Sequence, residues 1–182
     1  NDNTIRVEKY LSEQGIMSRR EAQAAIKSGG IVLNGKTLTD TGVKIDPSRD
    51  TIELRAHTQK KLEDKETVAV YKPRGVISSK DSDGVKTVFD VFPQFKKLNT
   101  VGRLDKESEG LLLLSNDGMV TKLVTGKEHI IEKEYIVTVR EDITPAMMKR
   151  MSTGIKLDDG WTKPAHAEKI DTHTFSIILT EG

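Results

Sequence analysis

A short run of leucines constrains the fold of this chain more than any other feature of its sequence. Residues 111–114 are all leucine, with Gly110 before them and an Asn-Asp-Gly turn at residues 116–118 after them. A short apolar run bounded by glycine and turn residues is typical of a strand that is buried on both faces. We therefore predict a buried strand here, and we expect Asp105, a few residues earlier, to lie at the lip of a cleft.

The residues at the start of the chain predict a small domain of their own. The apolar spacing in residues 7–11 indicates a helix, and Ser18 and Glu21 form a capping box that starts a second helix. Residues 31–36 are a strand that runs into an Asn-Gly turn, which is a strong signal for a hairpin. Together these patterns predict an α/β domain over residues 1–56, near the lower size limit for a core of its own.

A charged segment and a second domain follow. Residues 57–66 are rich in acids and bases and contain one aliphatic residue, Leu62, which is typical of a linker. From residue 67 the pattern is mostly that of strands and turns, and it predicts a domain over residues 67–182 with a mostly antiparallel, mixed β-sheet and short helices. The predicted fold class is therefore α+β.

Composition excludes several classes of site. The chain has no cysteine, so disulfides and thiolate metal sites are excluded. It shows no apolar segment of signal-peptide length at its start and no stretch near the roughly 20 apolar residues that a membrane span needs. We therefore expect a cytoplasmic protein without a membrane partner.

Total charge does not identify a partner, because 29 basic residues face 28 acidic ones and the net charge is +1. Nucleic-acid binding would need a local basic patch on this nearly neutral chain. The candidates for such a patch are Lys9, Arg19, Arg20, Lys27 and Lys36, on or near the two predicted helices and the hairpin. An ordinary solvated surface is the alternative, because residues 1–55 hold nine basic and eight acidic residues.

Asp105 has three interpretations from its neighbours alone. It is a turn acid that pairs locally with Arg103 or Lys106, or one of a pair of glycosidase carboxylates with Glu107 or Glu109, or a single nucleophilic or basic carboxylate. Nothing in the spacing shows two acids on opposite sides of one sugar, as a glycosidase requires.

The single tryptophan also has two interpretations. Trp161 lies among Gly160, Thr162 and Pro164 in a segment typical of a loop. We predict that its ring anchors this loop by packing, with stacking on RNA as the alternative.

The first 55 residues resemble a known RNA-binding domain. Residues 7–11, 15–22 and 32–35 closely resemble the ribosomal protein S4-type RNA-binding domain. The resemblance implies that the helix pair and the hairpin hold structured RNA by its shape and its phosphates, which suits A-form RNA because its deep groove hides the bases. It makes candidate RNA contacts of Arg19, Arg20, Lys27 and Lys36, with Lys9 on the first helix.

Asp105 falls within a longer resemblance. The signature motif of the RsuA-type pseudouridine synthases resembles residues 102–105 and 108–118, and two further motifs of that family resemble residues 71–76 and 132–137. The resemblance implies that Asp105 is the catalytic aspartate, that Tyr135 stacks on the target uracil, and that Arg103 fills the space left by the flipped nucleotide.

The same resemblance implies a reaction and its partner. The reaction would be site-specific isomerisation of uridine to pseudouridine in a ribosomal RNA stem-loop, by a protein that acts as a monomer. Because the isomerisation neither loses nor adds atoms, no cofactor and no metal are implied. The first helices look most like those of large-subunit enzymes, which favours 23S RNA. The alternatives are 16S RNA as the substrate, or a non-catalytic RNA-binding or ribosome assembly factor.

The family pattern continues past the last predicted strand. It adds an Arg-rich helix and a motif whose arginine pairs with the catalytic aspartate, whereas this sequence ends at Gly182. We therefore expect the domain over residues 67–182 to be C-terminally incomplete and Asp105 to lack that arginine partner.

Overall fold

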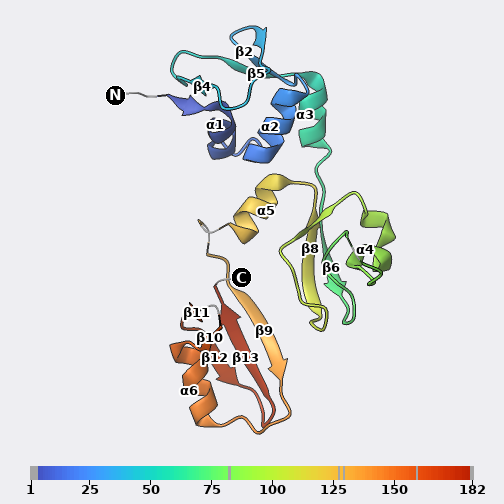
Figure 1. Ribbon diagram of the computed structural model, residues 1–182, viewed down its shortest axis with the longest axis vertical. Helices are drawn as coiled ribbons and strands as arrows, with labels where there is room; N and C mark the ends of the chain where they lie inside the picture. Colours follow the sequence, from blue (N-terminus) through green and yellow to red (C-terminus); the bar gives the residue numbers. More distant parts are fainter. Residues whose placement is uncertain (1–3, 82, 127, 129, 159, 181–182) are drawn as a thin grey trace. The chain divides into compact units, whose positions relative to one another are not determined.

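The computed structural model of the protein describes residues 4–180 except for residues 82, 127, 129 and 159. The chain folds into two compact units, the first ending at Val124 and the second beginning at Thr125 (Figure 1). Both units combine helices with antiparallel strand pairs, which confirms the predicted α+β class. None of the helices in these described ranges is long and apolar enough to cross a membrane.

The N-terminal part of the first unit packs two helices against short strands (Figure 1). Its elements are β1 (Ile5–Arg6), α1 (Val7–Glu13), α2 (Arg19–Lys27), β2 (Ile31–Leu33), β3 (Lys36–Thr37), β4 (Lys44–Ile45) and β5 (Ile52–Leu54). The strands form an antiparallel sheet in the order β3-β2-β5 and a separate β1-β4 pair. The first hydrophobic core consists of Val7, Leu11, Met17, Ala22, Ile26, Ile31, Leu38 and Ile45.

Two local predictions for this part are confirmed. The Ser18 amide donates to Glu21 Oε2 at 2.7 Å and the Glu21 amide donates to Ser18 Oγ at 3.3 Å, so the capping box starts α2. Asn34 and Gly35 form the two-residue turn between β2 and β3, with φ angles of 50° and 76°. Left-handed backbone at both turn positions is what this kind of hairpin requires, and Asn-Gly supplies it with little strain.

The segment predicted as a charged linker is largely helical. Helix α3 (Ala56–Glu63) occupies most of residues 57–66, with Thr58 buried and Leu62 packed against the first core. Thr58 and Leu62 are four residues apart, so they lie on the same face of a helix and give it one buried side. The composition of this segment indicated only a linker and did not reveal the helix or its buried face.

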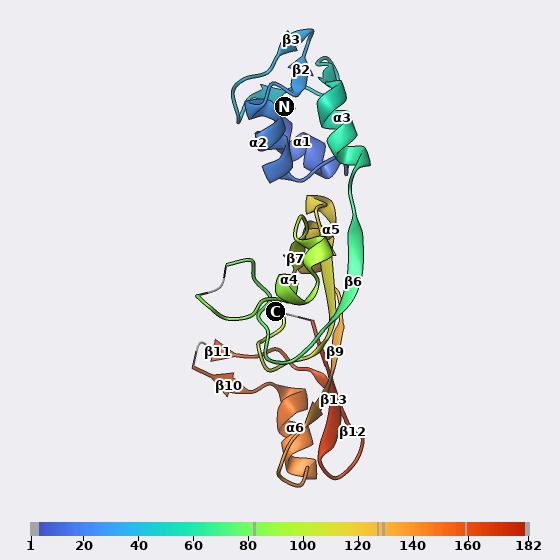
Figure 2. The ribbon, with the colours of Figure 1, turned by 90° about the vertical axis from the view of Figure 1, so that its right-hand side faces the viewer.

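The rest of the first unit is built around a second core. Its elements are β6 (Thr67–Lys72), α4 (Val88–Val91), the 3-10 helix η1 (Pro93–Phe95), β7 (Asn99–Val101), β8 (Gly110–Ser115) and α5 (Gly118–Thr125). The strands form an antiparallel sheet in the order β6-β8-β7, and α4 lies on one side of it (Figure 2). The second core consists of Val70, Val88, Phe89, Leu98, Leu112 and Leu114.

The leucine run forms the central strand of this sheet, but it is not buried on both faces. Leu112 and Leu114 lie in the second core, whereas Leu111 is 72% exposed and pairs with Tyr71, which is 63% exposed. Strand β7 pairs only with residues 113–115, so Leu111 has a neighbouring strand on one side alone. A strand is buried on both faces only where other elements pack around it. Among the described strands, the end of β8 that follows the Asp105 loop has only β6 beside it, and Leu111 there stays exposed.

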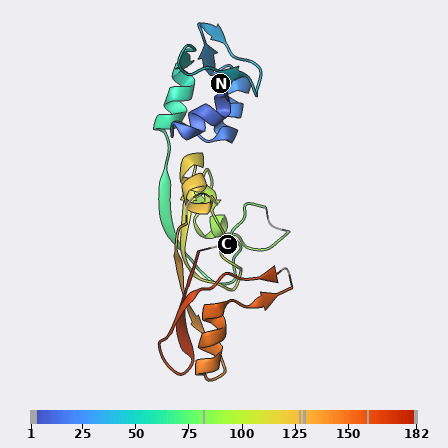
Figure 3. The ribbon, with the colours of Figure 1, turned by 90° about the vertical axis from the view of Figure 1, so that its left-hand side faces the viewer.

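The second unit is an antiparallel sheet with one helix. Its elements are β9 (Lys133–Thr138), α6 (Pro145–Thr153), β10 (Lys156–Leu157), β11 (Gly160–Trp161), β12 (His166–Lys169) and β13 (Thr174–Leu179). The sheet order is β12-β13-β9, with α6 against β12, and β10 and β11 form a separate hairpin (Figure 3). Tyr135 and Val137 are half-buried and alternate with the exposed Glu134 and Ile136.

Candidate active site

Asp105 lies in the loop of residues 102–109, called here the Asp105 loop, which joins β7 to β8. The residue is exposed, and within the described part of the chain its carboxylate makes no hydrogen bond or ion pair. Only its backbone oxygen is engaged, as acceptor for the Ser108 amide at 3.1 Å. The local ion pair with Arg103 or Lys106 is therefore not formed, and the acid is presented to solvent.

A fully buried lysine holds the loop from the inside. Lys72 ends strand β6 and is 0% exposed. Its Nζ donates to the backbone oxygens of Ser108 at 2.7 Å, Pro73 at 3.0 Å and Lys106 at 3.4 Å. Lysine is almost never fully buried unless its charge is compensated. Here backbone carbonyls provide that compensation, so the shape of the loop and the position of the lysine depend on each other.

A buried serine fixes the residue that precedes Asp105. Ser78 Oγ donates to the Leu104 carbonyl oxygen at 2.9 Å and accepts from the Leu104 amide at 3.1 Å. Thr100 Oγ1 in turn donates to the Ser78 carbonyl at 3.4 Å, and the Gly75 amide donates to the Lys106 carbonyl at 2.8 Å. Residues 72–78 therefore hold the Asp105 loop at several backbone positions, and sequence reasoning did not assign this role to Lys72 or Ser78.

The charges around the loop are unevenly paired. Burial lowers the pKa of the Lys72 ammonium, while the carboxylates of Glu107, Asp105 and Glu109 act in the opposite direction. Glu109 also forms an ion pair with Arg74, with 3.4 Å between Oε1 and Nε. All three acids belong to one short loop, so nothing supports a glycosidase pair on opposite sides of a ligand. Among the described residues, no group of three or more histidine or acidic side chains could hold a metal ion.

The other two predicted site residues lie in different units. Arg103 is exposed and lies in the same loop as Asp105, in the first unit. Tyr135 lies in the second unit, on β9, where it pairs with Ile177 of β13. Its ring is half-buried on the face that it shares with Val137.

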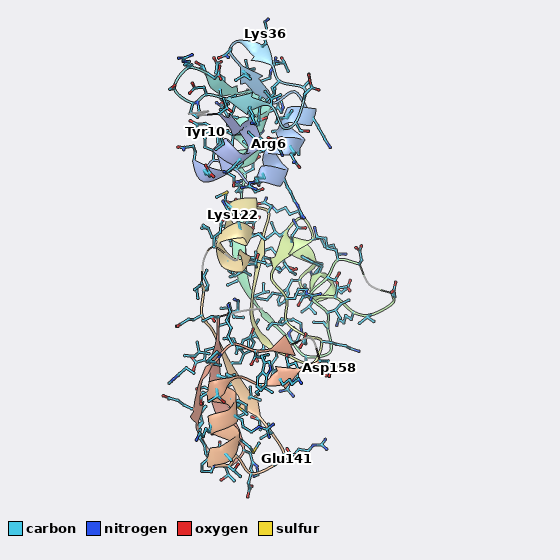
Figure 4. All side chains as sticks on the ribbon, turned by 60° about the vertical axis from the view of Figure 1, so that its left-hand side comes forward. Arg6, Tyr10, Lys36, Lys122, Glu141 and Asp158 are labelled. Atoms are coloured by element: carbon cyan, nitrogen blue, oxygen red, sulfur yellow. The ribbon has the colours of Figure 1, made fainter. Side chains whose placement is uncertain are left out.

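All five cations predicted to contact RNA are exposed, namely Lys9, Arg19, Arg20, Lys27 and Lys36. Arg20 and Lys27 are seven residues apart in α2, which is close to two helical turns, so they share one helix face. Lys36 lies at the tip of the β2–β3 hairpin (Figure 4). Lys9 forms an i,i+4 ion pair with Glu13 at 3.5 Å, which leaves it less available than the others.

Arg55 is a further cation at this end of the domain that sequence reasoning missed. Its Nη2 donates to Thr37 Oγ1 at 2.5 Å, next to Lys36 on the hairpin. A Cβ added to Gly29, just after α2, would lie 3.5 Å from the Thr37 methyl group. The end of α2, the hairpin and Arg55 are therefore neighbours, and only the tertiary contact through Thr37 reveals it.

The start of α2 also contacts the start of α5. Lys65 Nζ lies 2.8 Å from Asp117 Oδ1 and 3.5 Å from Glu21 Oε1, and the Gly118 amide donates to the same Glu21 oxygen at 3.2 Å. Burial acts to raise the pKa of Asp117, but the Lys65 ammonium and the Met119 amide outweigh it and the pKa is lowered. This α2–α5 junction joins the two cores of the first unit through charged side chains.

Comparisons with known proteins cover nearly the whole chain. Residues 66–177 match the family described as RNA pseudouridylate synthase, and residues 5–50 match the S4 domain. The dual-specificity RNA pseudouridine synthase RluF of Escherichia coli K12 is 36% identical over 100% of this chain and 62% of its own length. The ribosomal large subunit pseudouridine synthase B of Bacillus subtilis 168 is 38% identical over 97% of this chain and 75% of its own length.

A solved structure agrees with these relatives. The crystal structure of a pseudouridylate synthase superimposes with a TM-score of 0.62 and 27% identity, over 98% of this chain and 78% of that one. The chain spans less than two thirds of the length of the Escherichia coli relative. The predicted resemblance to RsuA-type synthases is confirmed at the level of the family, because both domains occur here in the expected order. The chain belongs to the RNA pseudouridylate synthase family and carries an S4 domain ahead of its synthase domain.

Proposed function

We propose that this protein converts uridine to pseudouridine in ribosomal RNA, with 23S RNA of the large subunit as its substrate and the Asp105 carboxylate as its catalytic group. The observation that carries the proposal is an exposed carboxylate, without an ion pair or hydrogen bond to any described residue, on a loop whose backbone is held by Lys72 and Ser78. The loop falls within residues 66–177, the part of the chain that matches the synthase family. The name of the Bacillus subtilis relative supports the choice of the large subunit.

The chemistry needs a carboxylate and little else. The N1–C1′ bond of uridine breaks, the uracil turns, and a C5–C1′ bond forms. The proton on C5 leaves and N1 gains a proton, so the overall change is an isomerisation without a co-reactant. Asp105 acts at the ribose, and both available roles, attack on the sugar and removal of a ribose proton, require its charged form.

The remaining candidate residues bind and position the RNA. Tyr135 stacks on the detached uracil, and Arg103 occupies the space that the flipped nucleotide leaves in the RNA. Flipping is needed because the reacting C1′ and C5 atoms are poorly accessible in stacked RNA. The S4 domain holds phosphates of the stem through Arg19, Arg20, Lys27 and Lys36, which makes affinity dependent on salt.

The test compares two acids of the same loop. Asp105→Asn should reduce pseudouridine formation by about 10³-fold or more while RNA affinity changes less than about twofold, because the substitution removes only the reacting charge. Glu107→Gln, which changes an exposed acid two residues away, is the matched control and should modify RNA at a rate near that of the unchanged protein. Pseudouridine is mapped by carbodiimide labelling and primer extension on 23S and 16S RNA.

The outcomes separate the alternatives. Modification that survives Asp105→Asn would exclude Asp105 as the catalytic residue. Modification of 16S RNA alone would correct the substrate. Tight RNA binding without modification, even by the unchanged protein, would favour the non-catalytic RNA-binding or assembly factor.

A further inference from the structure

The sequence context of Trp161 predicted a ring that anchors a loop by packing, and this prediction is wrong. Trp161 is 72% exposed on strand β11, which pairs with β10 in a hairpin. Its cross-strand partner is Lys156, and Leu157 pairs with Gly160. A large aromatic ring in water contributes little to folding, so burial does not explain why an indole stands at this position.

The hairpin that carries Trp161 is fixed at its base. The Thr162 amide donates to the Ile155 carbonyl and the Ile155 amide donates to Thr162 Oγ1, both at 2.9 Å. Gly154, which ends α6, has a φ of 96°, and a Cβ added to it would lie 2.6 Å from the Thr162 carbonyl oxygen. Any other residue at Gly154 would therefore push the hairpin away from α6. The indole is exposed on a backbone that is held in place.

The surroundings of the ring are charged. Lys156 is exposed directly across from Trp161, and opposed residues in an antiparallel pair have Cβ atoms about 5 Å apart. Lys163 follows two residues after Trp161, and Asp158 is exposed at the turn end of the hairpin (Figure 4). The buried centres of protein–protein interfaces are depleted of charged residues, so this setting does not favour a protein partner.

We propose that the β10–β11 hairpin is a stacking site for one unpaired base of the RNA, with the indole of Trp161 on the base and the ammonium of Lys156 on an adjoining phosphate. Aromatic rings beside cations bind single-stranded nucleic acid in this way, because every base has a π-face and every linkage a negative charge. The inference rests on the proposed function in that the ligand is RNA. It adds a contact in the second unit, outside both the S4 domain and the Asp105 loop.

The chain contains a single tryptophan, so its fluorescence reports on this residue alone. The Asp105→Asn protein is titrated with a ribosomal RNA stem-loop that has an unpaired loop, and binding is followed independently by the anisotropy of labelled RNA. Stacking should quench the emission in parallel with binding, whereas a fully paired duplex of equal length should bind with much less quenching. Emission that stays constant while the stem-loop saturates the protein would overturn the proposal.

Variants of the hairpin provide a second measurement. Trp161→Ala should weaken binding of the stem-loop roughly 5- to 150-fold, while Trp161→Phe, which keeps a ring, should lose much less. Leu157→Ala is the matched control because it removes another exposed apolar side chain from the same hairpin, and its affinity should stay within about twofold. Circular dichroism melting checks that each variant is folded. Equal affinity of the Trp161→Ala protein and its parent would contradict the stacking site.

These results distinguish failure of the hairpin from failure of the enzyme. Pseudouridine formation together with unquenched emission would remove the stacking site and leave the proposed function standing. Quenched emission without pseudouridine formation by the unchanged protein would remove the proposed activity and leave the stacking site. A blue shift of the emission as the free protein is concentrated would show that a second copy covers the ring, which would also overturn the proposal.

Discussion

Lys72 and Lys65 both lie largely inside the first unit, yet their charges are compensated in opposite ways. Lys72 donates to three backbone carbonyls, and its pKa is lowered by burial. Lys65 lies between the carboxylates of Asp117 and Glu21, and it lowers the pKa of Asp117. Carbonyl contacts fix the course of a backbone, whereas carboxylate contacts join side chains from different elements. The first arrangement therefore shapes a loop, and the second joins two helices.

The largest effect is expected from removing the lysine that shapes the loop. Lys72→Met should lower the free energy of unfolding by about 2–4 kcal/mol, because the carbonyls of Ser108 and Pro73 lose a buried donor. Part of that loss is offset because no charge remains buried. Turnover should fall with it while RNA affinity stays near that of the parent. Denaturant unfolding and pseudouridine mapping measure the two effects.

Lys106→Met is the matched control for this change, because it removes an exposed lysine from the same loop. Its effect on unfolding should be within about 0.5 kcal/mol. If Lys72→Met were as mild as Lys106→Met, the carbonyl contacts would not determine the shape of the loop.

Removing the hydroxyl that brackets Leu104 should have the next largest effect. Ser78→Ala leaves both the amide and the carbonyl of Leu104 without their partner, which should cost about 1–2 kcal/mol in unfolding and reduce turnover. Ser79→Ala removes the neighbouring hydroxyl, which accepts an exposed hydrogen bond from the Asp81 amide, and should be nearly neutral. Comparable turnover in the two variants would show that activity does not depend on the two hydrogen bonds between Ser78 Oγ and the Leu104 backbone.

The junction between the helices should be more tolerant. Lys65→Met should lower the free energy of unfolding by about 1 kcal/mol, since Asp117 and Glu21 keep their contacts to backbone amides when the ammonium is gone. Turnover of RNA that is already bound should change little, because the Asp105 loop keeps all of its contacts. A loss as large as that of Lys72→Met would remove the distinction between the two lysines.

The smallest expected effects are on the pH dependence of stability, where Asp117 acts in the acid range and Lys72 in the alkaline range. The lowered pKa of Asp117 means that the folded protein binds fewer protons than the unfolded chain near and below the ordinary value of 3.8. The stabilisation is therefore present above this value and lost as the pH falls through the folded pKa. Asp117→Asn should flatten this acid limb in urea unfolding curves measured between about pH 2 and 5.

Lys72 should act in the alkaline range. Because its pKa is lowered, the folded protein releases this proton at a lower pH than the unfolded chain does. The free energy of unfolding is therefore higher above the ordinary lysine value of 10.5, and this gain is lost as the pH falls through the folded pKa. Lys72→Met should remove this alkaline rise and leave the acid limb unchanged. A variant that altered both limbs would show that the two sites are coupled.

Local features of the fold could be predicted, while those that depend on distant residues could not. The α2 capping box and the Asn-Gly hairpin each need only adjacent residues, so their sequence patterns were sufficient. Leu111 was expected to be buried because its run is apolar, but exposure depends on how far β7 extends. Helix α3 was missed because its buried face requires the first core.

In the candidate site, too, residues in a local motif could be predicted and residues that act through distant contacts could not. Asp105 and Arg103 were chosen from a contiguous motif, whereas Lys72 and Ser78 act on residues about 26–36 positions later in the chain. The pairing of Lys72 with carbonyl oxygens leaves no trace in side-chain types, because every residue has a carbonyl. Trp161 was expected to be packed, and only the position of β11 at an open hairpin shows the ring in water.

The Asp105 loop owes its form to hydrogen bonds in which the Asp105 carboxylate takes no part. Loss of this carboxylate should therefore abolish catalysis and leave the folded loop and RNA binding intact. Replacing that one carboxylate by an amide should give a stable, inactive protein that still binds its RNA target and can be used to isolate it from a cell extract. The identity of the natural target could then be read directly from the captured strand.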